Sequence, residues 1–207
     1  MSQYGIYQPF GISREVFELS EEAMRIARDA FSRVDEIKEK RQVEVLAAFV
    51  EARVSESAFM AKTGYGYGDT GREKAEAVFA LAMGADDALV RIQFGSGTHV
   101  LSTCLHGLIN PGDEMLIVTG RPYDTLIPTL GATEDALTGE RLYPAEDAGV
   151  SRRSLSARGA SVRQLDLLSH GSPDLESIRA CVKPDTRMVY IQKSRGYSAR
   201  RALVAED

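Results

Sequence analysis

Apolar residues recur at helical spacing through the first part of the chain, from Ser13 to about Met60. The positions between them are rich in Glu, Arg, Lys and Ala, which gives one apolar and one charged face. This spacing predicts two long amphipathic helices, with Ser13 and the acidic residues after it as start signals. We expect residues 1–62 to form a helical arm. The apolar positions are Val16, Leu19, Ala23, Ile26, Ala27, Ala30, Val34 and Ile37.

A loop of glycine and tyrosine, Gly64–Arg72, interrupts this pattern and precedes a short helical stretch at about 73–82. The change in composition places the expected domain boundary between residues 62 and 63, with a second domain over 63–207. The loop contains the spacing G-x-G-x-x-G. A helix precedes these glycines, whereas the dinucleotide fingerprint must follow a strand, so we do not expect a nucleotide site of that type.

The second domain alternates apolar, β-branched runs with helical stretches. The runs predict strands at 88–94, 114–119, 161–167 and 187–192. The stretches between them predict helices at 98–109, 125–130 and 174–181. Such alternation is typical of an α/β fold with a mainly parallel sheet and helices on both faces. The polar stretch at 132–159 is expected to be a surface excursion.

Composition narrows the class of protein further. The 207 residues include 25 basic and 30 acidic ones, which gives a formal charge of -5. Because the chain has no net excess of Lys and Arg, we expect it to bind neither a nucleic acid nor an anionic membrane. The sequence contains no apolar run long enough to span a bilayer and no secretory leader at Met1, and its two cysteines suit a reducing compartment. We expect a cytoplasmic protein. The three histidines lack metal-ligand spacing, so no metal site is expected.

Small residues at Ser96, Gly97 and Thr98 lie between the run at 88–94 and the predicted helix. A helix start leaves backbone N–H groups unpaired at the positive end of the helix dipole, which suits a phosphate group. A simple N-cap after a tight turn explains the same residues equally well.

A second candidate follows the next strand, at Arg121–Asp124. Ligands of open parallel sheets bind beyond the carboxyl ends of the strands, so this segment and Ser96–Thr98 should lie on one rim. Tyr123 is there a candidate to stack on a flat cofactor, although half-buried packing is the alternative. The segment Lys193–Tyr197 follows a third strand at the same rim, and its two cations could meet a carboxylate or phosphate. A solvated loop explains this segment equally well.

Several of these segments, taken in order, resemble the methionine gamma-lyase-like family. This family is also known as aluminium resistance proteins or cystathionine beta-lyase-like proteins. The resemblance implies the aspartate aminotransferase-like (type I) fold, of which this chain would hold part of the large domain, and pyridoxal 5'-phosphate as cofactor. The segments are Gly64–Arg72, Ala85–Arg91, Ser96–His99, Pro111–Glu114, Thr119–Thr125 and Ile191–Tyr197.

By this resemblance Ser96, Gly97 and Thr98 would hold the cofactor phosphate. Tyr123 would stack on the pyridine ring and is the one catalytic candidate. In related carbon-sulfur lyases a glycine-tyrosine loop crosses a dimer interface, so Tyr65 or Tyr67 would complete the site of a neighbouring subunit. The family removes the α-proton of an amino acid and eliminates a sulfur-bearing group, with the cofactor as electron sink.

This sequence also differs from the family in length and in its lysines. Family members run to about twice this length, and the lysine that binds their cofactor covalently follows the Arg-Gly-Tyr stretch, so the sequence is expected to be a truncated member. Of its six lysines only Lys193 lies near the predicted rim. Two functions remain open: the amino-terminal portion of a lyase for a cystathionine-type or methionine-type amino acid, homodimeric or homotetrameric in full, or a catalytically inactive fragment that binds a phosphate ligand or a partner chain.

Overall fold

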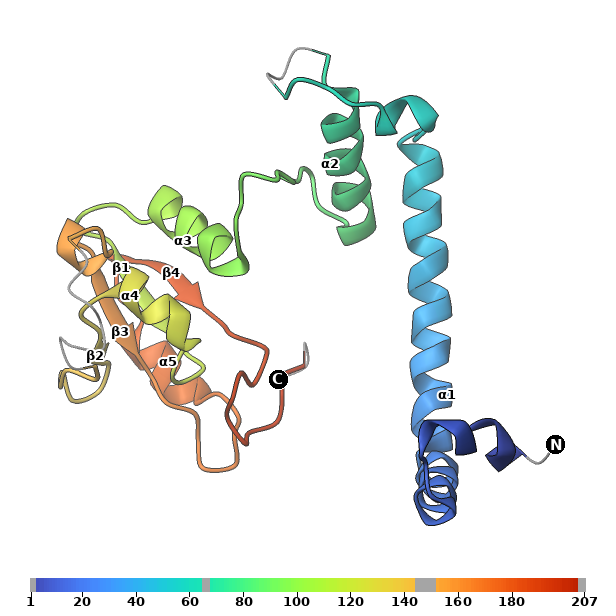
Figure 1. Cartoon of the computed structure of the whole chain (residues 1–207). Helices are drawn as coiled ribbons and strands as arrows, with labels where there is room; N and C mark the ends of the chain where they lie inside the picture. Colours follow the sequence, from blue (N-terminus) through green and yellow to red (C-terminus); the bar gives the residue numbers. More distant parts are fainter. Residues whose placement is uncertain (1–2, 65–67, 144–151, 205–207) are drawn as a thin grey trace. The chain divides into compact units, whose positions relative to one another are not determined.

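A computed structural model describes residues 3–64, 68–143 and 152–204. The chain divides into two compact units, residues 1–92 and 93–207 (Figure 1). The boundary expected after residue 62 therefore lies within the first unit. Among the helices that are described, none is long and apolar enough to cross a membrane.

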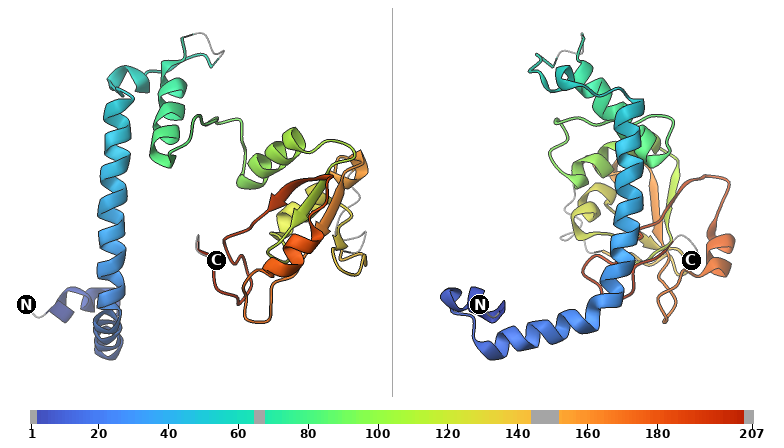
Figure 2. Two further views of the ribbon diagram at one scale, coloured as in Figure 1. Left: turned by 180° about the vertical axis from the view of Figure 1, so that it is seen from behind. Right: turned by 90° about the vertical axis from the view of Figure 1, so that its right-hand side faces the viewer.

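One long helix, α1, spans Arg14–Glu51 and dominates the first unit. Ser13 caps it by accepting a hydrogen bond from the N–H of Val16 at 3.2 Å, as its sequence predicted. The expectation of two helices is wrong, because residues 14–51 contain neither glycine nor proline to interrupt the backbone. The helix curves rather than running straight (Figure 2). Two 3-10 turns, Gln3–Ile6 and Gln8–Phe10, precede it.

The second helix, α2 (Thr70–Met83), packs against the last turns of α1. Ala48, Ala52 and Val78 are buried between the two helices. A 3-10 turn, Glu56–Phe59, joins them. Packing of α2 on α1 explains why the first unit extends well beyond residue 62.

The strand expected at 88–94 does not form. The N–H of Val90 donates to Glu76 Oε1 at 3.1 Å, and the Arg91 guanidinium pairs with the same carboxylate at 2.7 Å. This segment therefore bonds to a side chain of α2 instead of to a neighbouring strand. An apolar, β-branched run has the composition of a strand whether or not a partner exists.

The second unit contains a four-stranded sheet in the order β2-β3-β1-β4. Its strands are β1 (Glu114–Ile117), β2 (Glu134–Asp135), β3 (Ser161–Gln164) and β4 (Thr186–Tyr190). All three neighbouring pairs run parallel, which confirms the expected α/β class. The short β2 comes from the polar stretch at 132–159, where no strand was expected.

Helices cover both faces of this sheet, as the sequence predicted (Figure 1). On one face, α3 (Gly97–Leu108) and α4 (Ile127–Leu130) pack over Met115 and Ile117 of β1. On the other face, α5 (Leu175–Cys181) contacts the residues that alternate with them. Both faces of β1 are therefore buried, and all its residues except Glu114 are apolar. The described part of this unit also contains the 3-10 turns Asp124–Leu126 and Ser156–Arg158.

Candidate functional site at the carboxyl edge of the sheet

The carboxyl ends of β1, β3 and β4 meet at one edge of the sheet, which we call the carboxyl edge. The Gln192 N–H donates to Thr119 Oγ1 at 2.9 Å and thereby joins the segments after β4 and β1. A cavity of about 470 Å³ opens beside them. Its lining residues are Thr119, Gly120, Arg121, Pro122, Tyr123, Asp124, Asp166, Leu167, Gln192, Arg195, Gly196, Tyr197, Ser198 and Arg200.

Tyr123 is held at this edge by its backbone and by its hydroxyl. Its N–H donates to Gln192 Oε1 at 2.9 Å, and its hydroxyl donates to that of Tyr197 at 3.0 Å. The two rings are tilted by 32° with centroids 5.4 Å apart, and Gly196, whose backbone is left-handed, lies beside the Tyr123 ring. The hydrogen bond with Tyr197 raises the pKa of Tyr123 above its ordinary value, so the phenol stays neutral at physiological pH.

The turn before α3 has the geometry of a helix start with free donors. Ser96 caps the helix by accepting from the His99 N–H at 3.1 Å, so the simple capping reading is correct for that side chain. The N–H groups of Gly97 and Thr98 have no acceptor among the described residues. A Cβ at Gly97 would meet nothing within 4 Å, so the space above the turn is open. A small anion fits these donors.

The expected closeness of the two candidate segments is confirmed by one contact. Thr98 Oγ1 and Thr125 Oγ1 are hydrogen-bonded at 2.7 Å, which ties the start of α3 to the segment after β1. Residues 96–98 are nevertheless outside the set that lines the 470 Å³ cavity. The turn and the cavity are neighbouring features of one edge.

The three arginines at this edge differ in the partners that they have. Arg121 pairs with Asp124 at 3.0 Å in solvent and lies 5.0 Å from the ring centroid of Tyr143. Arg200 donates to the Gln192 and Ser194 carbonyls at 3.1 and 2.7 Å and so braces the loop after β4. Arg195 has no ion-pair partner among the described residues.

Sequence reasoning missed three contributors to this edge. Gln192 ends a predicted strand, and its amide, which positions Tyr123, gives no local signal in the sequence. Asp166 accepts from Gln164 Nε2 at 2.9 Å and also lines the cavity. Burial raises the pKa of Tyr143 to about 12, and its hydroxyl donates to Gln164. Tyr65 and Tyr67 lie outside the described residues, so their predicted role is untested.

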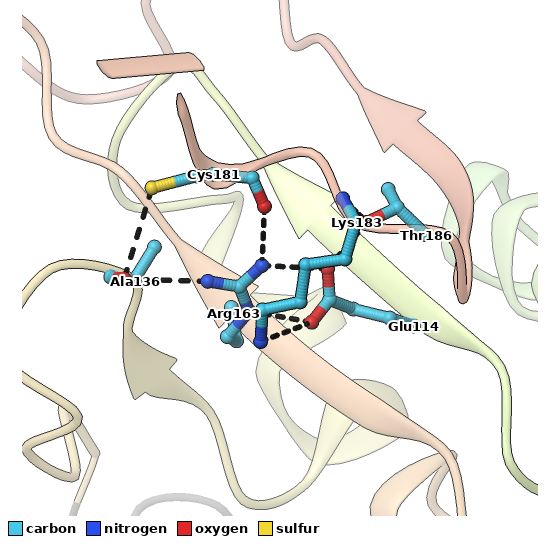
Figure 3. Close-up of polar contacts among 6 residues, drawn as sticks. All are labelled: Glu114, Ala136, Arg163, Cys181, Lys183 and Thr186. Atoms are coloured by element: carbon cyan, nitrogen blue, oxygen red, sulfur yellow. Dashed lines mark hydrogen bonds and ion pairs between the residues drawn. The ribbon is translucent and has the colours of Figure 1, made fainter. Parts of the chain in front are cut away.

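A second charged cluster lies near the amino ends of β1 and β4 and differs in kind (Figure 3). Arg163 donates to both carboxylate oxygens of Glu114, at 2.6 and 2.7 Å. Thr186 donates to the same carboxylate at 2.6 Å, and Lys183 pairs with it at 3.3 Å. Glu114 is 1% exposed and Arg163 7%. We call these four residues the buried ion-pair cluster.

The remaining donors of Arg163 are also satisfied. They reach the carbonyls of Cys181 at 2.6 Å and Ala136 at 3.3 Å (Figure 3). Burial alone would raise the pKa of Glu114, but hydrogen bonds from Arg163 and Thr186 lower it to about 2. The carboxylate of Glu114 and the guanidinium of Arg163 are buried and paired with each other, whereas Lys183 is half exposed. We therefore assign the Glu114–Arg163 pair to the stability of the fold.

Known proteins resemble this chain over nearly its whole length. A carbon-sulfur lyase involved in aluminum resistance from Clostridium novyi NT is 38% identical with a TM-score of 0.82, over 99% of this chain and 46% of that one. A candidate cystathionine beta-lyase involved in aluminum resistance from Clostridium acetobutylicum is 31% identical with a TM-score of 0.83, over 98% and 45%.

A further relative matches similar shares of the two chains. YnbB of Bacillus subtilis is 34% identical over 192 residues, which are 91% of this chain and 42% of that protein. The chain thus spans less than half the length of these relatives. The family model for methionine gamma-lyase matches residues 16–207. The chain therefore belongs to the methionine gamma-lyase family.

Proposed function

We propose that this chain binds pyridoxal 5'-phosphate and forms part of a carbon-sulfur lyase for a sulfur-containing amino acid of the cystathionine or methionine type. One observation carries the proposal: an aromatic plate, Tyr123, and a helix start with free donors, Gly97–Thr98, occur at one edge of a parallel sheet. Family membership supports it. In this proposal residues 63–207 contain part of the large domain of the aspartate aminotransferase-like (type I) fold.

The residues of the carboxyl edge fit such a cofactor. The Gly97 and Thr98 N–H groups and the hydroxyls of Ser96 and Thr98 would hold the phosphate. Ser96 accepts a hydrogen bond in the cap and keeps its own proton to donate, and Thr98 can donate to the phosphate while it accepts from Thr125. Tyr123, 37% exposed, would present its ring to the pyridine. The bound cofactor supplies an electron sink for reactions at the α-carbon of an amino acid. Tyr65 and Tyr67 would complete the site of a neighbouring subunit in a homodimer or homotetramer.

The α-proton transfer implied by the family resemblance uses a lysine. No lysine is among the residues described around the cavity, and Lys193 follows β4 without lining it. The proposal therefore assigns cofactor binding and positioning to this chain. The Arg195 guanidinium, which has no ion-pair partner in the part of the chain that the structure describes, would meet an anionic group of cofactor or substrate at the cavity.

A cofactor titration of paired variants tests the phosphate assignment. Gly97→Asp adds a carboxylate beside the free donors, and we expect binding of pyridoxal 5'-phosphate to weaken by about tenfold or more through charge repulsion. Gly97→Ala is the matched control, because the space there is open and the backbone is not left-handed. We expect it to bind within about threefold of the unchanged chain. Equal binding by both variants would refute the assignment.

The same preparation separates the lyase from the alternative function. The alternative is a catalytically inactive chain that binds a phosphate ligand or a partner. We expect the 207-residue chain to bind the cofactor reversibly, with no adduct after borohydride reduction and no sulfide released from a sulfur amino acid. An adduct at Lys193 together with turnover would show that this chain alone is an enzyme. Competition by inorganic phosphate, without any requirement for the pyridine ring, would favour the alternative.

A further inference from the structure

The part of α1 from Val16 to Ile37 carries an apolar stripe that no described element of its own unit covers. The stripe positions are Val16, Leu19, Ala23, Ile26, Ala27, Ala30, Val34 and Ile37. At 100° per residue the eight stripe positions fall within an arc of about 100°. Helix α2 packs on the same side but reaches only the last turns, around Ala48. The exposed fractions stay high along the stripe: Val16 54%, Leu19 70%, Ile26 74%, Val34 58% and Ile37 62%.

The stripe is symmetric about a point between residues 26 and 27. If a second α1 lay against it in the opposite direction, each large residue near one end would face a large residue near the other. Alanines would meet at the middle, where small side chains allow two helices to approach closely. The facing pairs are Val16 with Ile37, Leu19 with Val34, Ala23 with Ala30, and Ile26 with Ala27.

The charges beside the stripe have the same symmetry. In an antiparallel pair related by a two-fold axis, the same flank of each helix meets its copy. On one flank, Glu15 of one copy and Lys40 of the other are separated by about 3 Å along the helix axis, at 1.5 Å per residue. Glu22 of one copy and Arg33 of the other have the same separation. Glu15, Arg33 and Lys40 have no ion-pair partner among the described residues. Each copy would therefore supply acid to one end and base to the other.

The opposite flank is apolar where it would meet its copy. Met24, 57% exposed, comes to the level of Phe31, 47% exposed. We infer that residues 15–40 of α1 form a self-association surface, which pairs antiparallel with α1 of a second copy of this chain. The inference does not depend on cofactor binding.

Charge exchange on the 207-residue chain tests the pairing. We expect sedimentation velocity to show a dimer at micromolar concentration. The double variant Glu15→Lys, Glu22→Lys should dissociate about tenfold more readily, because four attractive contacts become repulsive. The variant Arg33→Glu, Lys40→Glu should do the same. Combining all four substitutions restores opposite charges at every contact and should restore the dimer.

A matched control makes the same change in net charge on a different face of the helix. The variant Glu21→Lys, Glu39→Lys alters the face opposite the stripe and should leave the dimer unchanged. A cysteine introduced by Ala27→Cys, with Cys104→Ser, should form an intermolecular disulfide near the two-fold axis, whereas Ala47→Cys should not.

A monomer at these concentrations would overturn the inference, whether the stripe is then covered by the second unit of the same chain or by another protein. A dimer whose dissociation is unchanged in both double variants would also overturn the inference, because a different surface would then hold the dimer together. Failure of the four-residue combination to restore the dimer would refute the antiparallel arrangement.

Discussion

The two ends of the parallel sheet hold similar residue types and use them in opposite ways. Near the amino ends of the strands, Glu114 and Arg163 satisfy each other and are almost fully buried. At the carboxyl edge, the Arg195 guanidinium has no ion-pair partner among the described residues, and the N–H groups of Gly97 and Thr98 have no acceptor among them. A cavity of about 470 Å³ lies alongside. Burial with complete pairing produces a fixed structural cluster, whereas unpaired donors beside a cavity are available to a ligand.

Among substitutions at the two ends of the sheet, removal of the buried Glu114 carboxylate should have the largest effect on the free energy of unfolding. Glu114→Ala leaves the Arg163 guanidinium buried without its counter-charge, and we expect a loss of about 4 kcal/mol in the free energy of unfolding. Denaturant titration measures it. The control Glu18→Ala breaks an ion pair with Arg14 whose side chains are 63% and 78% exposed, and it should change stability by less than about 0.5 kcal/mol. Equal losses would mean that burial does not distinguish the cluster.

Acid should weaken the same cluster within a defined pH range. The folded-state pKa of Glu114 is about 2, below its ordinary value of 4.5, so the unfolded chain binds the proton first. The stabilisation is complete above about pH 4.5 and is lost as the pH falls toward 2, by about 3 kcal/mol. The difference in unfolding free energy between the unchanged chain and Glu114→Gln, followed from pH 5 to pH 2, checks this. A difference that does not vary with pH would contradict it.

A substitution at the carboxyl edge should have the smallest effect on stability. Gln192→Ala removes the acceptor for the Tyr123 N–H, and we expect a loss of about 1 kcal/mol. Hydrogen exchange at that amide should become faster. Gln192→Glu retains the acceptor oxygen and serves as the control. A loss as large as that of Glu114→Ala would show that this edge is also a structural cluster.

Local features of the fold could be predicted because their causes lie within a few residues. Ser13 and Ser96 cap helices that their neighbours favour, and Tyr123 follows an apolar strand whose direction fixes the edge it reaches. The strand expected at 88–94 fails because strand formation needs a partner, and Glu76 bonds that backbone instead. Sequence pattern alone does not show which partner is present.

The contacts that link distant residues could not be predicted for the same reason. Glu114 and Arg163 are 49 residues apart, and nothing near either one marks the other. Gln192 and Tyr123 are separated by 69 residues. The sequence therefore indicated where chemistry could occur at the carboxyl edge, while the residues that position it became visible only in the folded chain.

The strand order has a consequence for synthesis on the ribosome. Strand β1 ends at Ile117, but both of its neighbours, β3 and β4, come later in the chain, and β4 ends only at Tyr190. At roughly 5–20 residues per second, β1 emerges some 4–15 s before its second neighbour has been made. Its four residues, Glu114 and three apolar ones, are all buried in the finished sheet, so the nascent chain exposes these side chains throughout that interval. Lower temperature or added chaperone during expression should therefore increase the yield of folded chain.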